Sequence, residues 1–265
     1  MDQSTYTFRQ PNSISELRAL LELRYRVYRE SRLQNFIADN PLGLDLDCYD
    51  LKSMHFGLFR CVYGMEIPVG YMRLVTDRVQ SSAYDIMSIS SADGTVLENV
   101  LQTPDAPFPV MTYAPAVDRV NEMYHELLNK GESIVEPGRF ALDESARGRL
   151  IAKQMVAATF AVTIANGIDS AILSCTLLHS RTYKQFGFNN FPGTEEFYCD
   201  QAGENALLLL LLGVRASLPE SERGKVMKMA KAYAETGCIF LDPSQPNQFT
   251  QPIRESNPVH ELIAA

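Results

Sequence analysis

A strand-like segment with proline and glycine in its interior constrains the fold most. Residues Ile134–Leu142 read IVEPGRFAL, with Pro137 and Gly138 in the middle. Proline donates no ladder hydrogen bond and glycine weakens a strand, so this segment predicts a bulged or splayed strand; the alternative is an edge strand that ends at Pro137. A bulge frees backbone groups to hold an amide-rich ligand or an oxyanion. Glu136 beside it is a candidate general base, and Arg139 is a second candidate catalytic residue.

A turn that contains arginine leads from this strand into a long helix. The turn is Asp143–Arg149 (DESARGR), and the helix is expected over about Ser145–Ala165. Free amides at a helix N-terminus bind anions, and nearby arginines strengthen the binding. The turn therefore predicts a site for a pyrophosphate or a phosphopantetheine phosphate, with a charged helix cap as the alternative. The candidate ligands are Ser145, Arg147, Gly148 and Arg149.

The first predicted helix places an arginine among its apolar residues. Ser13 and Glu16 form a capping box, and the helix is expected to run to about Glu30. At about 100° per residue, Arg24 falls inside the apolar stripe, whereas Arg26 falls on the opposite face. An unpaired buried guanidinium is very costly, so Arg24 needs an anion or a carbonyl as its partner, unless it snorkels to solvent.

Acidic residues in the next loop are the candidate partners of that arginine. Asp45, Asp47 and Asp50 lie close together there, and the last two have the spacing Asp-x-Tyr-Asp. Neighbouring carboxylates repel each other unless cations lie among them, and Arg24 and Arg73 are the obvious cations. We expect these arginines to form a charged, substrate-binding network with Asp47 and Asp50. The alternative is a solvated acidic loop, and the spacing does not fit a calcium-binding loop.

A tyrosine four residues before a glycine marks a third motif. The segment Ser180–Phe188 (SRTYKQFGF) predicts a short helix that is closed by Gly187. Tyr183 is a candidate to protonate a departing thiolate. The alternative is a half-buried aromatic residue that packs on a sheet.

The remaining pattern predicts further strands and helices. Strands are expected at His55–Val62, Ile67–Thr76, Ala171–Cys175 and Glu196–Cys199. Helices are expected at Ala116–Lys130, Ser180–Phe186, Glu204–Ser217 and Glu220–Thr236. Residues 77–115 are expected to be an irregular insertion or a mobile lid. The division that follows is an α/β domain over residues 1–200 and a C-terminal helical extension over residues 201–265, which ends in a polar, proline-containing tail.

Composition excludes several classes of protein. The net charge of -8, without a basic stripe, argues against a nucleic-acid module, although it leaves room for a local basic patch. The five cysteines are scattered and form no CxxC pair, so we expect neither a disulfide framework nor a metal site, but buried thiols in the reducing cytoplasm. No signal peptide is visible. The most apolar run, Ala206–Leu212, is far shorter than the roughly 20 residues of a membrane span.

The order of these elements resembles the core of the GNAT acyltransferases. The resemblance is carried by a strand, an arginine-containing turn, a long helix, a second strand and the motif Tyr183-x-x-x-Gly187-Phe188. The turn departs from the family pattern because Ala152 stands where glycine is usual. The resemblance implies a GNAT-like α/β (α+β) fold, with a central mixed, twisted sheet flanked by helices and a splayed or bulged strand.

The N-terminal half resembles the autoinducer synthases and the related long-chain N-acyl amino acid synthases. The matching motifs are Arg24-x-x-x-Tyr28, Asp47-x-Tyr49-Asp50, Gly70-x-x-Arg73-Leu74 and Glu136-x-x-Arg139-Phe140. The segment Leu23–Tyr28 with Ser53-x-His55 is similar to the exosortase-associated acyltransferase-like members. This resemblance implies an N-acyltransferase that moves a medium or long acyl chain from acyl-carrier protein or acyl-CoA to the amine of an amino acid. It also makes Phe140 a candidate substrate-binding residue.

Three other functions are compatible with the same motifs. They are an acyl-homoserine-lactone autoinducer synthase, an ordinary acetyl-CoA-dependent N-acetyltransferase, and a non-catalytic acyl-binding regulatory protein. Autoinducer synthases usually carry a tryptophan after the first helix, and this chain has no tryptophan. An N-acyl amino acid is therefore the favoured product.

Overall fold

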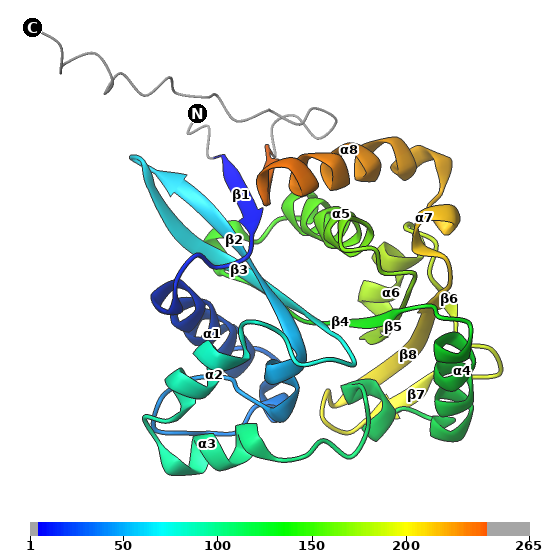
Figure 1. The fold of residues 1–265 in the computed structure, drawn as a ribbon, viewed down its shortest axis with the longest axis horizontal. Coiled ribbons are helices and arrows are strands. Elements are labelled where there is room, and N and C mark those ends of the chain that lie inside the picture. The colour runs from blue at the N-terminus through cyan, green and yellow to red at the C-terminus, as the bar shows by residue number, and fades with distance from the viewer. Residues whose placement is uncertain (1–4, 243–265) are drawn as a thin grey trace, which may run out of the picture.

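The structure, a computed structural model, describes residues 5–242, whose strands form one nine-stranded mixed sheet (Figure 1). The strands are β1 (Tyr6–Arg9), β2 (Ser53–Val62), β3 (Met65–Val75), β4 (Ile134–Leu142), β5 (Ser170–Thr176), β6 (Asn189–Asn190), β7 (Phe197–Cys199), β8 (Glu204–Leu211) and β9 (Cys238–Leu241). Their order across the sheet is β6-β8-β5-β4-β3-β2-β1-β9, and β7 also pairs with β8. The pairing of β4 with β5 is parallel and the other pairings are antiparallel.

Helices cover both faces of this sheet. They are α1 (Ile14–Arg29), α2 (Ala83–Ser90), α3 (Gly94–Leu101), α4 (Val117–Asn129), α5 (Arg149–Ala165), α6 (Leu177–Lys184), α7 (Val214–Ser217) and α8 (Glu220–Thr236). Four 3-10 turns join them: η1 (Gln34–Phe36), η2 (Cys48–Lys52), η3 (Pro109–Thr112) and η4 (Glu144–Ala146). Helices α5 and α8 pack in the main core against one face, whereas α1 and α4 pack in separate clusters against the other. The mixed, helix-flanked sheet confirms the predicted fold class.

The helix expected over residues 204–217 is wrong, because residues 204–211 form strand β8. Leu207, Leu209 and Leu211 point into the α5 core, and Leu208 and Leu210 point into the α4 cluster. A strand that is buried on both faces is a continuous apolar run, and such a run has no period that distinguishes it from a buried helix. Both β8 and β9 lie in the sheet, so residue 200 does not coincide with a boundary of the sheet.

The segment 77–115 is less irregular than expected, because it contains α2, α3 and η3. The side chain of Asp93 caps α3 by accepting a hydrogen bond from Val96 N at 3.1 Å. Val96 and Ile86 are buried in one cluster with Leu17 of α1. These short helices are held by an apolar stripe of only one or two turns, which is too short for a clear sequence period.

The other predicted helices and strands are present, with small shifts at their ends. Helix α6 begins at Leu177 instead of Ser180, and α5 begins at Arg149, after the η4 turn. The short strands β1, β6 and β9 had no counterpart in the prediction. Strand β1 pairs with both β2 and β9, and β9 forms that edge of the sheet. The proline-containing tail lies in residues 243–265, outside the described residues.

Candidate functional site

Strand β4 carries the predicted bulge. Across the β3–β4 ladder, Tyr71 pairs with Ala141 but Arg73 pairs with Gly138, so β4 has one extra residue opposite Met72. Arg139 takes up this excess with φ 55°, in the left-handed region that non-glycine residues seldom adopt. The strand continues through the bulge to Leu142, so it does not end at Pro137.

Beyond their first residues, β4 and β5 are not paired. The ladder between them holds only Ile134 with Ser170 and Val135 with Ala171. The divergence begins where the sequence continues with Glu136, Pro137 and Gly138. The prediction of a splayed strand is therefore confirmed, and a gap opens in the middle of the sheet beside the bulge.

Side chains around the gap are divided between the two faces of the sheet. Pro137 and Phe140 point toward α5, where they line a narrow cleft with a cavity volume of only about 10 Å³. Nearly all the other lining side chains are apolar: Met72, Val156, Thr159, Phe160, Thr163, Ala171, Tyr183, Phe188 and Val214. Glu136 accepts a hydrogen bond from η3, on the α4 side, and Arg139 binds the loop after α1. The polar side chains Glu136 and Arg139 and the apolar cleft thus lie on opposite sides of one gap.

Glu136 is a buried carboxyl group that accepts a backbone hydrogen bond. It is 5% exposed, and its Oε2 accepts from the backbone N–H of Val110 at 2.9 Å. Burial raises the pKa of Glu136 to about 8, although the Val110 amide and the charge of Arg73 oppose the shift. Because a positive charge lowers the pKa of a nearby carboxyl group, an ammonium ion brought beside Glu136 would favour the ionised form of Glu136.

Two tyrosines beside Glu136 were missed by the sequence analysis. The hydroxyl of Tyr49 is buried and has no hydrogen-bond partner among residues 5–242. Burial and then the charge of Glu136 raise the pKa of Tyr113, whose hydroxyl is hydrogen-bonded to the Ser174 side chain. Tyr49 stood inside a motif without a role of its own. Tyr113 lies in the segment that was expected to be irregular, and Ser174 lies in a predicted strand to which no functional role was given.

Arg24 is fully buried, so it does not snorkel to solvent. Both NH₂ groups of its guanidinium are hydrogen-bonded. Its Nη1 and Nη2 atoms donate to the two carboxylate oxygens of Asp50, each at 2.9 Å. Nη2 also donates to the Asp45 carbonyl, and Nε lies 2.9 Å from the Asp45 carboxylate. Burial pushes the pKa of Asp50 upward, but Arg24 and Arg73 hold it well below its usual range.

Arg73 and Arg139 complete this charged cluster. Arg73 donates to both carboxylate oxygens of Asp47, at 2.7 and 2.8 Å, and to Asp50 at 2.8 Å. Arg139 lies 3.2 Å from Asp47 and 3.4 Å from Asp45, and it also donates to the Phe36 carbonyl. Three arginines therefore contact three aspartates. The predicted network of Arg24, Arg73, Asp47 and Asp50 is present, and it also contains Arg139 and Asp45.

A neutral histidine borders the cluster. Burial lowers the pKa of His55 to about 4, so the ring is uncharged at neutral pH. Its Nε2 lies 3.1 Å from the Asp50 carbonyl, which can only accept, so Nε2 carries the proton. Its Nδ1 then accepts from the Tyr71 hydroxyl at 2.7 Å, and that hydroxyl accepts from Arg24 at 2.9 Å. This chain of donors fixes the orientation of Arg24.

The turn before α5 is open to solvent. Gly148 is the N-cap of α5 and offers no side chain to its free amides. Ser145 and Arg147 are exposed, and Arg147 Nε donates to the Leu142 carbonyl at 3.3 Å. The backbone of Arg149 begins the helix. The predicted anion-binding turn therefore has the required backbone arrangement.

Tyr183 both packs and lines the cleft. Its ring meets Phe188 edge-on, with the centroids 5.9 Å apart. Burial raises the pKa of Tyr183, so its hydroxyl stays protonated at neutral pH. Both descriptions from the sequence, the packed aromatic and the proton donor, are compatible with this position.

Within residues 5–242, no group of three or more metal-ligating side chains is arranged to hold a metal ion. Across that same range, none of the helices has the length and apolar character of a membrane-spanning helix.

The bulged β4, its splay from β5 and the long α5 that follows define a GNAT-like N-acyltransferase. More specifically, residues 19–212 match the family model described as N-acyl amino acid synthase FeeM, so this chain belongs to that family. The family and the acyltransferase activity are thus as predicted from the sequence motifs.

Several solved structures are similar to this chain. The structure of FeeM, an N-acyl amino acid synthase from uncultured soil microbes, is 14% identical with a TM-score of 0.51, and the match covers 83% of this chain and 97% of that one. The CoA-dependent acyl-homoserine lactone synthase BjaI is 14% identical with a TM-score of 0.49, covering 82% of each chain. Escherichia coli ElaA is 18% identical with a TM-score of 0.43, covering 78% of this chain and 98% of that one. No curated protein sequence matches this chain.

Proposed function

We propose that this enzyme transfers a medium or long acyl chain from a phosphopantetheine thioester to the amine of an amino acid. One observation carries the proposal: a buried carboxyl group, Glu136, lies on one side of the β4–β5 gap and an apolar cleft lies on the other. An acceptor amine can approach from the polar side while the acyl chain occupies the apolar side. Acetyl transfer alone would not need a cleft walled by Phe140, Phe160 and Phe188.

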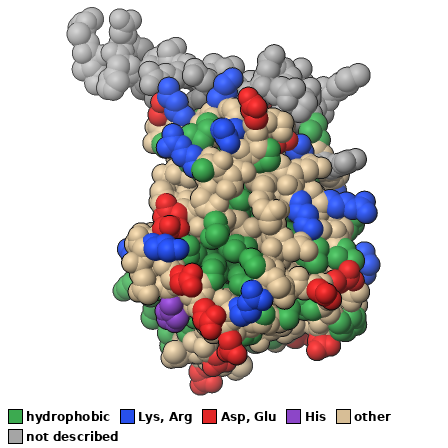
Figure 2. All heavy atoms as spheres, turned by 90° about the vertical axis from the view of Figure 1, so that its right-hand side faces the viewer, with side chains coloured by type: hydrophobic (Ala, Val, Ile, Leu, Met, Phe, Trp, Pro, Cys, Tyr) green, Lys and Arg blue, Asp and Glu red, His purple; other side chains and the backbone are tan. Residues whose placement is uncertain are grey.

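The donor arm occupies the gap between β4 and β5 in this proposal. The unpaired backbone of the bulge binds the pantetheine amides, and the α5 turn, with Ser145, Arg147, Gly148 and Arg149, binds the phosphate. Donor and acceptor are then held in reacting geometry, which lowers the barrier independently of any proton transfer. The donor is acyl-CoA or acyl-carrier protein. Figure 2 shows Lys and Arg side chains along the upper part of one face, which suits an acidic carrier protein.

The acceptor amino acid lies beside the charged cluster. Its carboxylate faces the partly accessible Arg139, and its amine faces Glu136. Arg24, Asp47, Asp50 and Arg73 hold the loop after α1 over this position. The cluster is electrically balanced, so it fixes the position of Arg139 and leaves that residue, at its edge, to bind the substrate.

Each bond change in the reaction has a candidate residue. The amine gives a proton to ionised Glu136, and its nitrogen attacks the thioester carbon to form a C–N bond. Backbone amides at the bulge stabilise the oxyanion. The C–S bond then breaks, and Tyr183 supplies a proton to the departing thiolate. Among residues 5–242 the cysteines are free thiols, but only Cys199 is buried and Cys61 is exposed, so the expectation that all of them are buried is wrong. Free thiols and a thioester donor fit a cytoplasmic enzyme.

A direct test combines the purified protein with acyl-CoA and acyl-carrier-protein donors and a mixture of amino acids. Mass spectrometry is expected to detect an N-acyl amino acid that forms only when donor, acceptor and enzyme are all present. A lactone formed only with S-adenosylmethionine would instead identify an autoinducer synthase. Tight donor binding without any product would identify an acyl-binding protein.

The raised pKa of Glu136 predicts a pH dependence of stability. Since the folded protein holds this proton up to about pH 8 and an ordinary carboxyl group releases it near 4.5, stability should fall as pH rises between these values. The slope from this one group is at most about 1.4 kcal/mol per pH unit. Urea unfolding of wild type and Glu136→Gln at a series of pH values measures it, and equal slopes in the two proteins would contradict the assignment.

Replacing Tyr183 by phenylalanine is expected to lower kcat by about tenfold or more, because the thiolate then leaves unprotonated or takes its proton from water. The ring is retained, so the melting temperature should stay close to that of wild type. Tyr233→Phe is the matched control, because Tyr233 packs against the same core without lining the cleft. Equal kcat values for the two variants would leave Tyr183 with a packing role only.

A further inference from the structure

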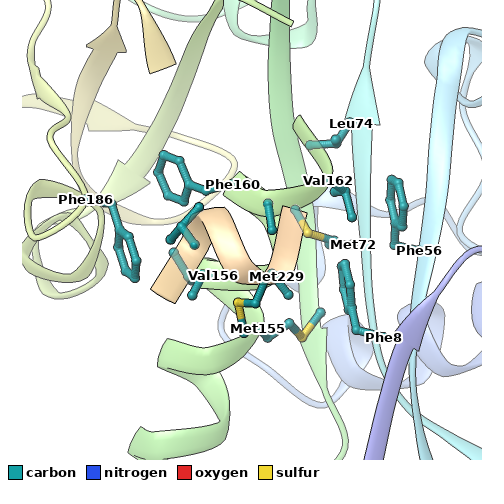
Figure 3. Packing of buried hydrophobic residues seen from close by; sticks show 14 of the residues in the cluster. Phe8, Phe56, Met72, Leu74, Met155, Val156, Phe160, Val162, Phe186 and Met229 are labelled. Atoms are coloured by element: carbon teal, nitrogen blue, oxygen red, sulfur yellow. The ribbon is translucent and has the colours of Figure 1, made fainter. Parts of the chain in front are cut away.

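Met72 lies where the cleft meets the main core. It stands on β3 opposite the bulge, and it has no direct partner in the β4 register. Its side chain is 3% exposed and lines the cleft, and its sulfur contacts the hydroxyl of Thr159 on α5. In Figure 3, Met72 lies between Phe160, which also lines the cleft, and Phe56 of the main core. Met72 therefore forms the inner wall of the cleft.

The core behind that wall contains further soft side chains. Met155 and Met229 are fully buried there, and Phe8 and Phe56 stack with their centroids 5.4 Å apart. Thr159 connects the two regions, because its hydroxyl contacts the Met72 sulfur and also donates to the Met155 carbonyl one turn away. A chain that passed Met72 would meet apolar, adaptable side chains.

Met72 also differs in kind from the other residues that line the cleft. Those residues are aromatic, branched or small, and each has few ways to move without shifting the backbone. Met72 is unbranched, with three rotatable side-chain bonds beyond Cα, and such a side chain changes rotamer at low cost. It is the lining residue whose size and rotamer decide how deep the cleft runs.

We propose that Met72 sets the length of the acyl chain that this enzyme accepts. The inference rests on the proposed function, because it takes the α5 cleft as the site of the acyl chain. The side chain ends the cleft in its present rotamer, and the terminal carbons of the acyl chain pack against its thioether. Cleft depth, and hence chain length, follows the volume at position 72.

Measuring kcat/KM for saturated acyl donors that differ by two carbons tests this. Met72→Ala removes three side-chain atoms and opens the cleft toward Met155. At about fourfold per buried methylene, the preference for a donor two carbons longer than the wild-type optimum should rise by about 16-fold. Met72→Phe fills the end of the cleft and should move the optimum at least two carbons shorter. Met72→Val removes less volume, and it should give a smaller shift toward longer chains if Met72→Ala does not fold.

Met229→Ala is the matched control. It removes the same atoms from an equally buried residue of the same core, but it does not line the cleft. It should lower stability and leave the chain-length optimum unchanged. An unchanged optimum in the folded Met72 variants, or an equal shift in Met229→Ala, would overturn the inference. Wild type that yields no N-acyl product from any donor would instead overturn the proposed function, and the inference with it.

Discussion

Glu136→Gln is expected to lower kcat for N-acyl transfer by about 10²–10⁴-fold, the usual contribution of a positioned general base. Glutamine keeps the side-chain oxygen that accepts from the Val110 amide, so the local structure should persist. It cannot take a proton from the acceptor amine. The loss should therefore appear in single-turnover rates measured with saturating donor and acceptor, while the affinity for the acyl donor stays close to that of wild type.

Glu144→Gln controls for the general effect of removing a carboxylate near this strand. Glu144 lies just past the end of β4 and is exposed, so its replacement should leave the rate within about twofold of wild type. A folded Glu136→Gln protein with wild-type rates would show that the acceptor amine loses its proton elsewhere. The unpartnered hydroxyl of Tyr49 would then be the next residue to replace.

Local chemistry made the polar half of this site predictable from sequence. Arg24 falls on the apolar side of its helix, and burial of a guanidinium requires an anion, so a partner had to lie nearby. Proline and glycine inside a strand likewise predicted the bulge, which the structure places at Arg139. In both cases a residue is unfavourable in its own helix or strand, and contacts within the site compensate for this cost.

Long-range contacts made the rest unpredictable. Tyr113 comes close to Glu136 only because η3 folds across the start of β4, and neither Tyr113 nor its partner Ser174 conflicts with its own segment. The leucines of β8 show no alternation of apolar and polar residues, because both faces of the strand are buried. Asp45 was recognised as an acidic neighbour, but its contact with Arg139 depends on the left-handed backbone at the bulge.

Arg24→Met is expected to lower the free energy of unfolding by about 3–5 kcal/mol, the usual cost of breaking a buried ion pair on one side. The change leaves Asp45, Asp47 and Asp50 with only two arginines, and Asp50 and Asp45 are almost completely buried. Methionine fills a similar volume, so the loss reflects uncompensated charge more than a cavity. Urea unfolding should show a lower midpoint for the variant.

Arg26→Met separates this effect from the loss of any arginine on the same helix. Arg26 is paired with Asp143 at 2.6 Å, but its side chain is 55% exposed, and such surface pairs contribute about 0–1 kcal/mol. A double variant, Arg24→Met with Asp50→Asn, should recover part of the loss, because removing the negative charge that Arg24 had neutralised restores the balance of the cluster. Equal midpoints for Arg24→Met and Arg26→Met would mean that solvent or a neighbouring cation neutralises the aspartates. The cluster would then not stabilise the fold, and its arginines would act in substrate binding alone.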